Sequence, residues 1–154
     1  MKKKLFIGFG LLVALGGSAL IVVGMAGVPE PVPYGEPGTP QYYTSDSFEQ
    51  PLPGIMVNLA VKERPTYVQI KATAVCRVGG PLQVGDTPGL FSDAEAHIRD
   101  ALIMLIGSKT PADVLCAEQK ELLKTQMKDK IQKIVFPDNH GRVEEILFRQ
   151  FQVQ

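Results

Sequence analysis

An uncharged, mostly apolar run occupies residues 5–28 and follows three lysines at positions 2–4. As an α-helix rising about 1.5 Å per residue, it would be about 36 Å long, enough to cross a hydrocarbon core about 30 Å thick. The next charge is Glu30, so the lysines favour a cytoplasmic N-terminus with the rest of the chain outside. The pattern predicts a cytoplasmic tail over residues 1–4 and a single transmembrane helix over residues 5–28.

A cleaved secretory signal is the alternative interpretation of this run, because Gly24 and Ala26 resemble a cleavage site. The run is longer than the roughly 7–15 apolar residues of a signal core, which favours a retained anchor. Within it, Gly10, Ala14 and Ser18 recur every fourth residue. This stripe is either a face for close helix packing or the ordinary composition of a membrane helix.

Proline dominates residues 29–53, which hold seven of the twelve prolines in the chain. Proline lacks an amide hydrogen and restricts its neighbours, so the segment predicts an extended linker rather than helix or sheet. This linker is either a passive spacer or a peptide ligand for a partner. The folded domain is then predicted over residues 54–154.

Alternation of apolar and polar residues predicts a half-buried strand over residues 66–78. The apolar segment 54–61 predicts another strand, and the polar residues 62–65 give a connection of hairpin length. We therefore expect the two strands to pair antiparallel. Glycine and proline interrupt the pattern over residues 79–89, which predicts an irregular loop.

A helix is predicted from Asp93 to Ile106, because Ser92 and Glu95 have the spacing of a capping box. Its last part is apolar nearly all round, so it is buried on more than one side or contacts another chain. Pro111 indicates the start of a short helical turn.

The stretch from residue 117 to 135 is amphipathic and predicts a second main helix, with one apolar face. That face contains Leu123, Met127, Ile131 and Ile134. A final strand is predicted over residues 143–153. The expected fold class is α+β: a small antiparallel sheet packed with two main helices, after a single transmembrane helix.

Charge disfavours nucleic acid as a partner. The chain has 16 basic and 16 acidic residues, and assigning the three N-terminal lysines to the cytoplasm leaves an acidic excess outside. Nucleic acid requires clustered positive charge. Cys76 and Cys116 are the only cysteines, and they are too far apart in the sequence to form a C-x-x-C redox motif. They are either inert thiols or a structural disulfide, and a catalytic role is the least favoured alternative.

No enzyme motif is evident in the sequence. His97 and His140 have no partners at the spacing of a metal or catalytic site, and neither a nucleophile elbow nor a phosphate-binding loop is present. We therefore expect no catalytic residues, no cofactor and no metal.

The segment IRDALIMLIGSKTPADVL, residues 98–115, resembles the hallmark of the flagellar basal-body-associated FliL family. Its motif positions are Arg99 and Asp100 at the start of an apolar helix, with Lys109 and Thr110 in the turn that follows. The segments VNLA, YVQIKATAV and LFRQFQVQ occur in the order expected of this family.

This resemblance implies a non-enzymatic protein of the bacterial inner membrane with a periplasmic domain of the stomatin (SPFH-like) type. It implies a homo-oligomeric ring that associates with the stator units of the flagellar basal body and supports motility. For the interface, we expect contacts from the apolar helix end and the final strand, at Leu102, Ile103, Ile106, Phe148 and Phe151. Each of these residues is equally well explained as intramolecular core.

A second functional class stays open on the sequence alone. The chain would then be a generic membrane-tethered periplasmic module, binding or hydrolytic, unrelated to motility.

Overall fold

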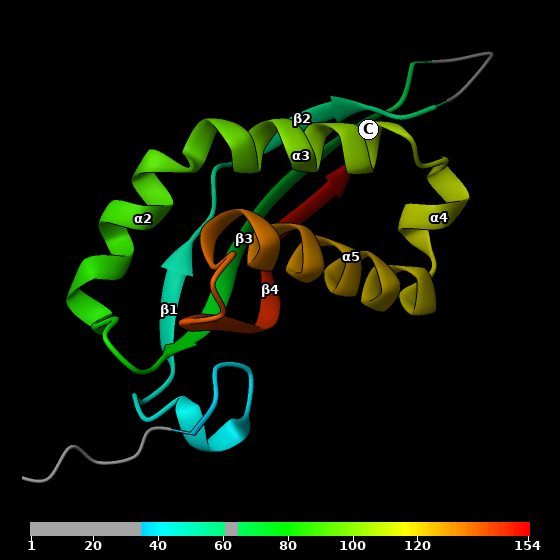
Figure 1. Ribbon diagram of the computed structural model, residues 1–154. Helices are drawn as coiled ribbons and strands as arrows, with labels where there is room; N and C mark the ends of the chain where they lie inside the picture. Colours follow the sequence, from blue (N-terminus) through cyan, green and yellow to red (C-terminus); the bar gives the residue numbers. More distant parts are fainter. Residues whose placement is uncertain (1–34, 61–64) are drawn as a thin grey trace, which may run out of the picture. The chain divides into compact units, whose positions relative to one another are not determined.

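The computed structural model describes residues 35–60 and 65–154 (Figure 1). Four strands form one antiparallel sheet, and α3 and α5 lie across one face of it. The strands are β1 (Phe48–Pro51), β2 (Ile55–Asn58), β3 (Tyr67–Val78) and β4 (Gly141–Val153). The helices are η1 (Pro40–Tyr42), η2 (Val84–Asp86), α2 (Thr87–Asp93), α3 (Glu95–Gly107), α4 (Pro111–Leu115) and α5 (Ala117–Val135). The predicted α+β class is confirmed.

β3 is the central strand. It pairs with β4 along its whole length, from Val68 opposite Val153 to Val78 opposite Gly141. β1 and β2 both pair with the edge of β3 that is opposite β4. β2 pairs with the first part of β3, and β1 pairs with the last part. The predicted antiparallel pairing of β2 with β3 is confirmed by the register of Ile55 opposite Ile70.

Alternation along β3 places every second side chain in the core, as the sequence predicts. The buried residues on the helix side are Val68, Ile70, Ala72, Ala74, Cys76 and Val78. Thr73 points the other way and is nevertheless buried, and its hydroxyl accepts a hydrogen bond of 3.2 Å from Arg149 Nε. An arginine side chain therefore shields part of the sheet face that carries no helix.

α5 begins and ends where the amphipathic pattern predicts, and it buries Leu123, Met127 and Ile131 against the sheet. Its end is tied to β4 by the side chain of Gln132. The Gln132 amide donates to the Gly141 carbonyl at 2.9 Å, and the Val143 amide donates to Gln132 Oε1 at 2.8 Å. This pair of hydrogen bonds satisfies backbone groups at the start of an edge strand.

Two expectations about the helices are wrong. α2 occupies part of the predicted irregular loop, because Pro88 lies in its first turn, where proline is compatible with a helix. Ser92 consequently lies inside α2, and no side chain caps α3. A capping box is present instead at α4, where Thr110 Oγ1 accepts from the Asp113 amide and the Asp113 carboxylate accepts from the Thr110 amide.

The extended linker predicted over residues 29–53 is also wrong for its second half. η1 and β1 form there, and Tyr42, Tyr43 and Leu52 are buried. Prolines did not prevent this, since Pro40 starts η1 and Pro51 ends a short edge strand. Residues 29–34 of the predicted linker lie outside the described residues. So do the predicted cytoplasmic tail and the predicted transmembrane helix with its Gly10, Ala14 and Ser18 stripe.

No helix among residues 35–60 and 65–154 is long and apolar enough to cross a membrane. Both cysteines are free thiols in the structure. Cys76 lies in the sheet core and Cys116 is exposed between α4 and α5. Burial, and to a smaller extent the nearby charge of Glu144, together raise the pKa of the Cys76 thiol to about 12.

Candidate functional site

The motif positions predicted from the family resemblance lie along α3 and the turn after it. Arg99 is exposed and pairs with Glu95 one helical turn earlier, at 2.7 Å, and Asp100 is also exposed. The backbone carbonyl of Lys109 accepts a 3.0 Å hydrogen bond from the Ala60 amide. Arg99 and Asp100 are therefore available to a partner, whereas the Lys109 backbone joins the α3–α4 turn to the β2–β3 hairpin.

Thr110 has a structural role as the N-cap of α4. Its backbone amide and its hydroxyl both donate to Asp113 Oδ2, at 2.9 and 2.8 Å. These hydrogen bonds, the backbone one first, lower the pKa of the Asp113 carboxyl, and the charge of Lys109 acts in the same direction. The negative carboxylate is thus held at the start of a short helix, where the backbone amides favour it.

The five candidate interface residues fall into three groups. Leu102 and Ile106 are 1% and 0% exposed and belong to the core beneath α3. Ile103 is 39% exposed on the outer side of the same helix. Its neighbour Met104 is 70% exposed and is absent from the sequence-based candidates. The only sequence feature that pointed to an exposed Met104 was the apolar composition on all sides of this helix end.

Phe148 and Phe151 are half-buried at the end of β4, with ring centroids 5.2 Å apart. The Lys120 ammonium lies 5.1 Å from the centroid of the Phe151 ring, and that of Lys124 lies 5.7 Å from Phe148. Both distances fit cation–π contacts. The aromatic pair is thus partly covered from within the chain by α5, and only the remainder of each ring can meet a partner.

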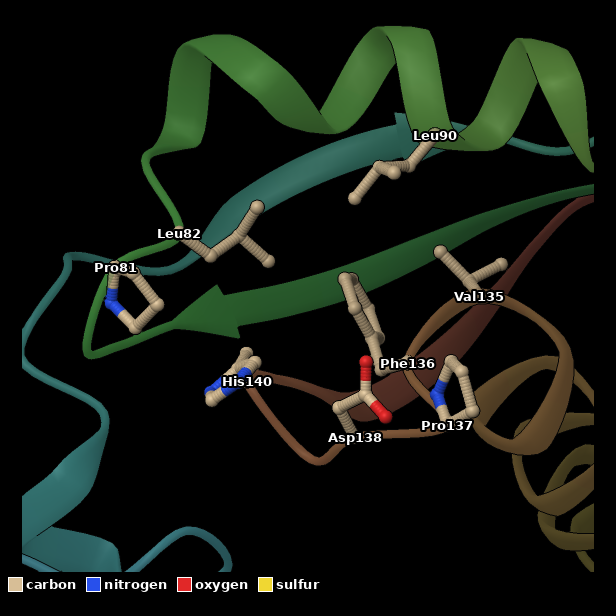
Figure 2. Close-up of a pocket in the computed structure, with 8 residues that line it drawn as sticks. All are labelled: Pro81, Leu82, Leu90, Val135, Phe136, Pro137, Asp138 and His140. Carbon is tan, nitrogen blue, oxygen red and sulfur yellow. The ribbon is translucent and has the colours of Figure 1, made fainter.

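A separate apolar pocket opens where β3 and β4 meet the loop before α2. Figure 2 shows Leu90 of α2 and Leu82 facing Val135 and Phe136 at the end of α5. The pocket has a volume of about 320 Å³, and its only titratable lining groups are Asp138 and His140. Such a lining can hold a small apolar group, but it contains no paired nucleophile and base.

His140 is held in place by the segment of residues 39–46, which we call the N-terminal strap. The Tyr42 hydroxyl is hydrogen-bonded to His140 Nδ1, and the two rings are stacked with centroids 5.8 Å apart. The Tyr43 hydroxyl donates to the Asn139 carbonyl at 3.1 Å. Neither tyrosine contact is predictable from local sequence, because the partner residues lie almost a hundred residues later.

The strap also depends on two glycines after β3. A Cβ at Gly79 would lie 1.9 Å from the Tyr42 carbonyl oxygen, and one at Gly80 would lie 2.0 Å from the Tyr42 hydroxyl. Gly80 moreover has a positive φ of 60°, which favours glycine. The Ser45 side chain accepts a 2.9 Å hydrogen bond from the Val78 amide. These features together seat the strap against the end of the sheet.

Among the described residues, no three His, Cys, Asp or Glu side chains come close enough together to hold a metal ion. His97 is exposed on α3. The family model for the flagellar basal body-associated protein FliL matches residues 50–154. The chain belongs to the FliL family.

A flagellar protein FliL from Aquifex aeolicus (strain VF5) is 32% identical over 104 residues. That match covers 66% of this chain and 58% of the relative, so the chain spans little more than half of that curated protein. The FliL match begins inside β1 and includes all helices from α2 to α5. The N-terminal strap precedes it.

Proposed function

We propose that this chain is a non-enzymatic accessory protein of the flagellar motor. In this proposal the apolar run 5–28 anchors it in the inner membrane by a single pass, and the α+β domain, of the stomatin-like kind, lies in the periplasm. Copies of the domain form a ring that associates with the stator units and stabilises them during swimming or swarming. The observation that carries the proposal is the FliL family match over residues 50–154.

Surface properties of α3 support an interaction role. Ile103 and Met104 are exposed apolar residues, although neighbouring Leu102 and Ile106 already complete the core. Arg99 and Asp100 beside them are exposed charged groups. Apolar side chains surrounded by charge are typical of a contact with another protein.

Deletion of the gene in the native organism tests the proposal. We expect weaker swimming or swarming while filaments still assemble, and a fluorescent fusion of the full chain should co-localise with motors. Photoreactive residues at Arg99 and at Phe148 should yield adducts with stator subunits or with a second copy in intact cells. Normal motility together with a fusion spread evenly over the membrane would contradict the proposal.

A further inference from the structure

Two surfaces of opposite charge flank α3. The first is a hollow of about 500 Å³, which we call the acidic hollow. It is lined by Ser92, Asp93, Glu95, Ala96, Arg99, Asp100 and Ile103. Arg99 is paired with Glu95, so its charge is already compensated. Asp93 and Asp100 take part in no ion pair among the described residues, and the hollow has a net negative charge.

The second surface is a groove of about 350 Å³ between α3 and α5, which we call the basic groove. It is lined by Leu105, Lys109, Gln126, Asp129, Lys130 and Lys133. None of these three lysines forms an ion pair within the part of the chain that the structure describes. The single carboxylate of Asp129 leaves the groove with a net positive charge.

The two surfaces face away from each other. Ile103 in the hollow and Leu105 in the groove are two residues apart on α3, so they point about 160° apart around the helix axis. A chain therefore cannot join its own hollow to its own groove. A two-fold dimer that contacts through either surface would place like charges together, whereas a head-to-tail contact places opposite charges together.

We propose that the acidic hollow of one copy binds the Lys130 and Lys133 side chains at the rim of the basic groove of the next copy. The inference rests on the proposed function and deepens it, since it names the surfaces through which the ring would form. Asp93 and Asp100 receive the two ammonium groups, and Ile103 adds an apolar contact at the end of the hollow beyond Asp100. The contact is heterologous, so its repetition closes a ring when the rotation from one copy to the next divides a full turn.

The test uses the full chain in its native membrane with a photoreactive residue in place of Ala96, which lines the hollow. Illumination should give self-adducts that map to residues 126–133 of a second copy. The matched position is Gln152, an exposed residue of β4 away from α3, which should give none. Adducts from Ala96 to a stator subunit or a lipid, without self-adducts, would overturn the proposal.

Charge reversal tests the pairing itself. We expect Lys130→Glu with Lys133→Glu, or Asp93→Lys with Asp100→Lys, to reduce the self-adduct about tenfold, since each places like charges together. Cells that express both double variants together should regain the adduct between copies. The unchanged hollow of the lysine variant can then bind the unchanged groove of the aspartate variant, and the two reversed surfaces also carry opposite charges. This rescue also shows that both variants fold.

The matched control reverses two lysines outside the groove, Lys71→Glu with Lys128→Glu, and should leave the self-adduct unchanged. Equal loss in this control, or no loss in the two test variants, would overturn the proposed pairing. If a probe at Ala96 gives no self-adducts while a probe at Phe148 does, the result supports a ring but contradicts this interface. If no position yields self-adducts, the result contradicts the ring itself.

Discussion

Tyr42 lies against His140, 98 residues later in the chain, with its hydroxyl hydrogen-bonded to the imidazole Nδ1. This contact attaches the N-terminal strap to the turn between α5 and β4. The strap is thus part of the folded domain rather than a free linker, and any movement transmitted along the chain from its N-terminal side reaches this contact early.

Truncation of Tyr42 should destabilise the domain, because its ring is 4% exposed. We expect Tyr42→Ala to lower the free energy of unfolding by about 3 kcal/mol, the cost typical of removing a buried aromatic ring. Tyr42→Phe, which removes only the hydroxyl, should cost about 1 kcal/mol. Urea unfolding of a fragment of residues 35–154 measures both, and equal stabilities of the two variants would contradict a packing role for the ring.

Gly79→Ala should displace the strap, because the added methyl group would meet the Tyr42 carbonyl oxygen. Limited proteolysis should then cut between residues 39 and 47 at least about tenfold faster than in the native chain, since a detached strap is an exposed segment. Gly85→Ala is the matched control, because nothing lies within 4 Å of a Cβ there. Resistance of Gly79→Ala to cleavage would show that the strap tolerates the change.

Thiol labelling should distinguish the two cysteines. Because the pKa of Cys76 is raised to about 12, its reactive thiolate is scarce at pH 8, and burial blocks access as well. Iodoacetamide should therefore add one group to the native chain, at Cys116, and two in urea, as read by mass. In Cys116→Ser the native adduct should vanish, and a persistent adduct would mean that the sheet core opens.

Adjacent residues of α3 should respond differently to truncation. Leu102→Ala creates a cavity in the core and should cost about 3 kcal/mol of stability. Ile103→Ala removes an exposed side chain and should change stability by no more than about 0.5 kcal/mol. If Ile103 lies in a contact between copies, Ile103→Ala should still lose self-adducts in membranes. A stability loss equal to that of Leu102→Ala would place Ile103 in the core instead.

The cap of α4 should make stability depend on pH. The pKa of Asp113 is lowered below its ordinary value of 3.8, so its ionised form stabilises the fold above that pH, and this contribution is lost as pH falls through the folded-state pKa. Thr110→Ala should therefore be less stable than the native domain at pH 7, with a smaller difference below pH 3.8. Thermal unfolding across this pH range measures the difference in stability. Ser108→Ala is the control and should show no such dependence on pH, because the Ser108 hydroxyl donates to the Leu105 carbonyl at the end of α3 and not to a carboxylate.

Local periodicity was sufficient to predict α5 and β3, since each element carries its own apolar pattern over more than ten residues. It missed β1 because four residues that include a proline carry no such pattern, and their burial depends on pairing with β3. It also could not separate Leu102 from Ile103. At a helix end that is apolar on all sides, only the position of the sheet decides which side chain is inside.

The candidate site was less accessible to prediction than the fold. Arg99, Asp100, Lys109 and Ile103 were named from the sequence, but Asp93 of the acidic hollow and Lys130 and Lys133 of the basic groove were not identified as interface groups. These groups become one surface only when α3 and α5 are side by side, and the strap contact at Tyr42 likewise requires a turn far along the chain.

β1, β2 and β4 each pair with β3 and, within the described part of the chain, not with one another. A pull applied ahead of Tyr42 would therefore load the strap first, then the short ladder of β1, and only then the central strand. We therefore expect tension from the N-terminal side to detach the strap and β1 before it separates β3 from β4, whose ladder is longer.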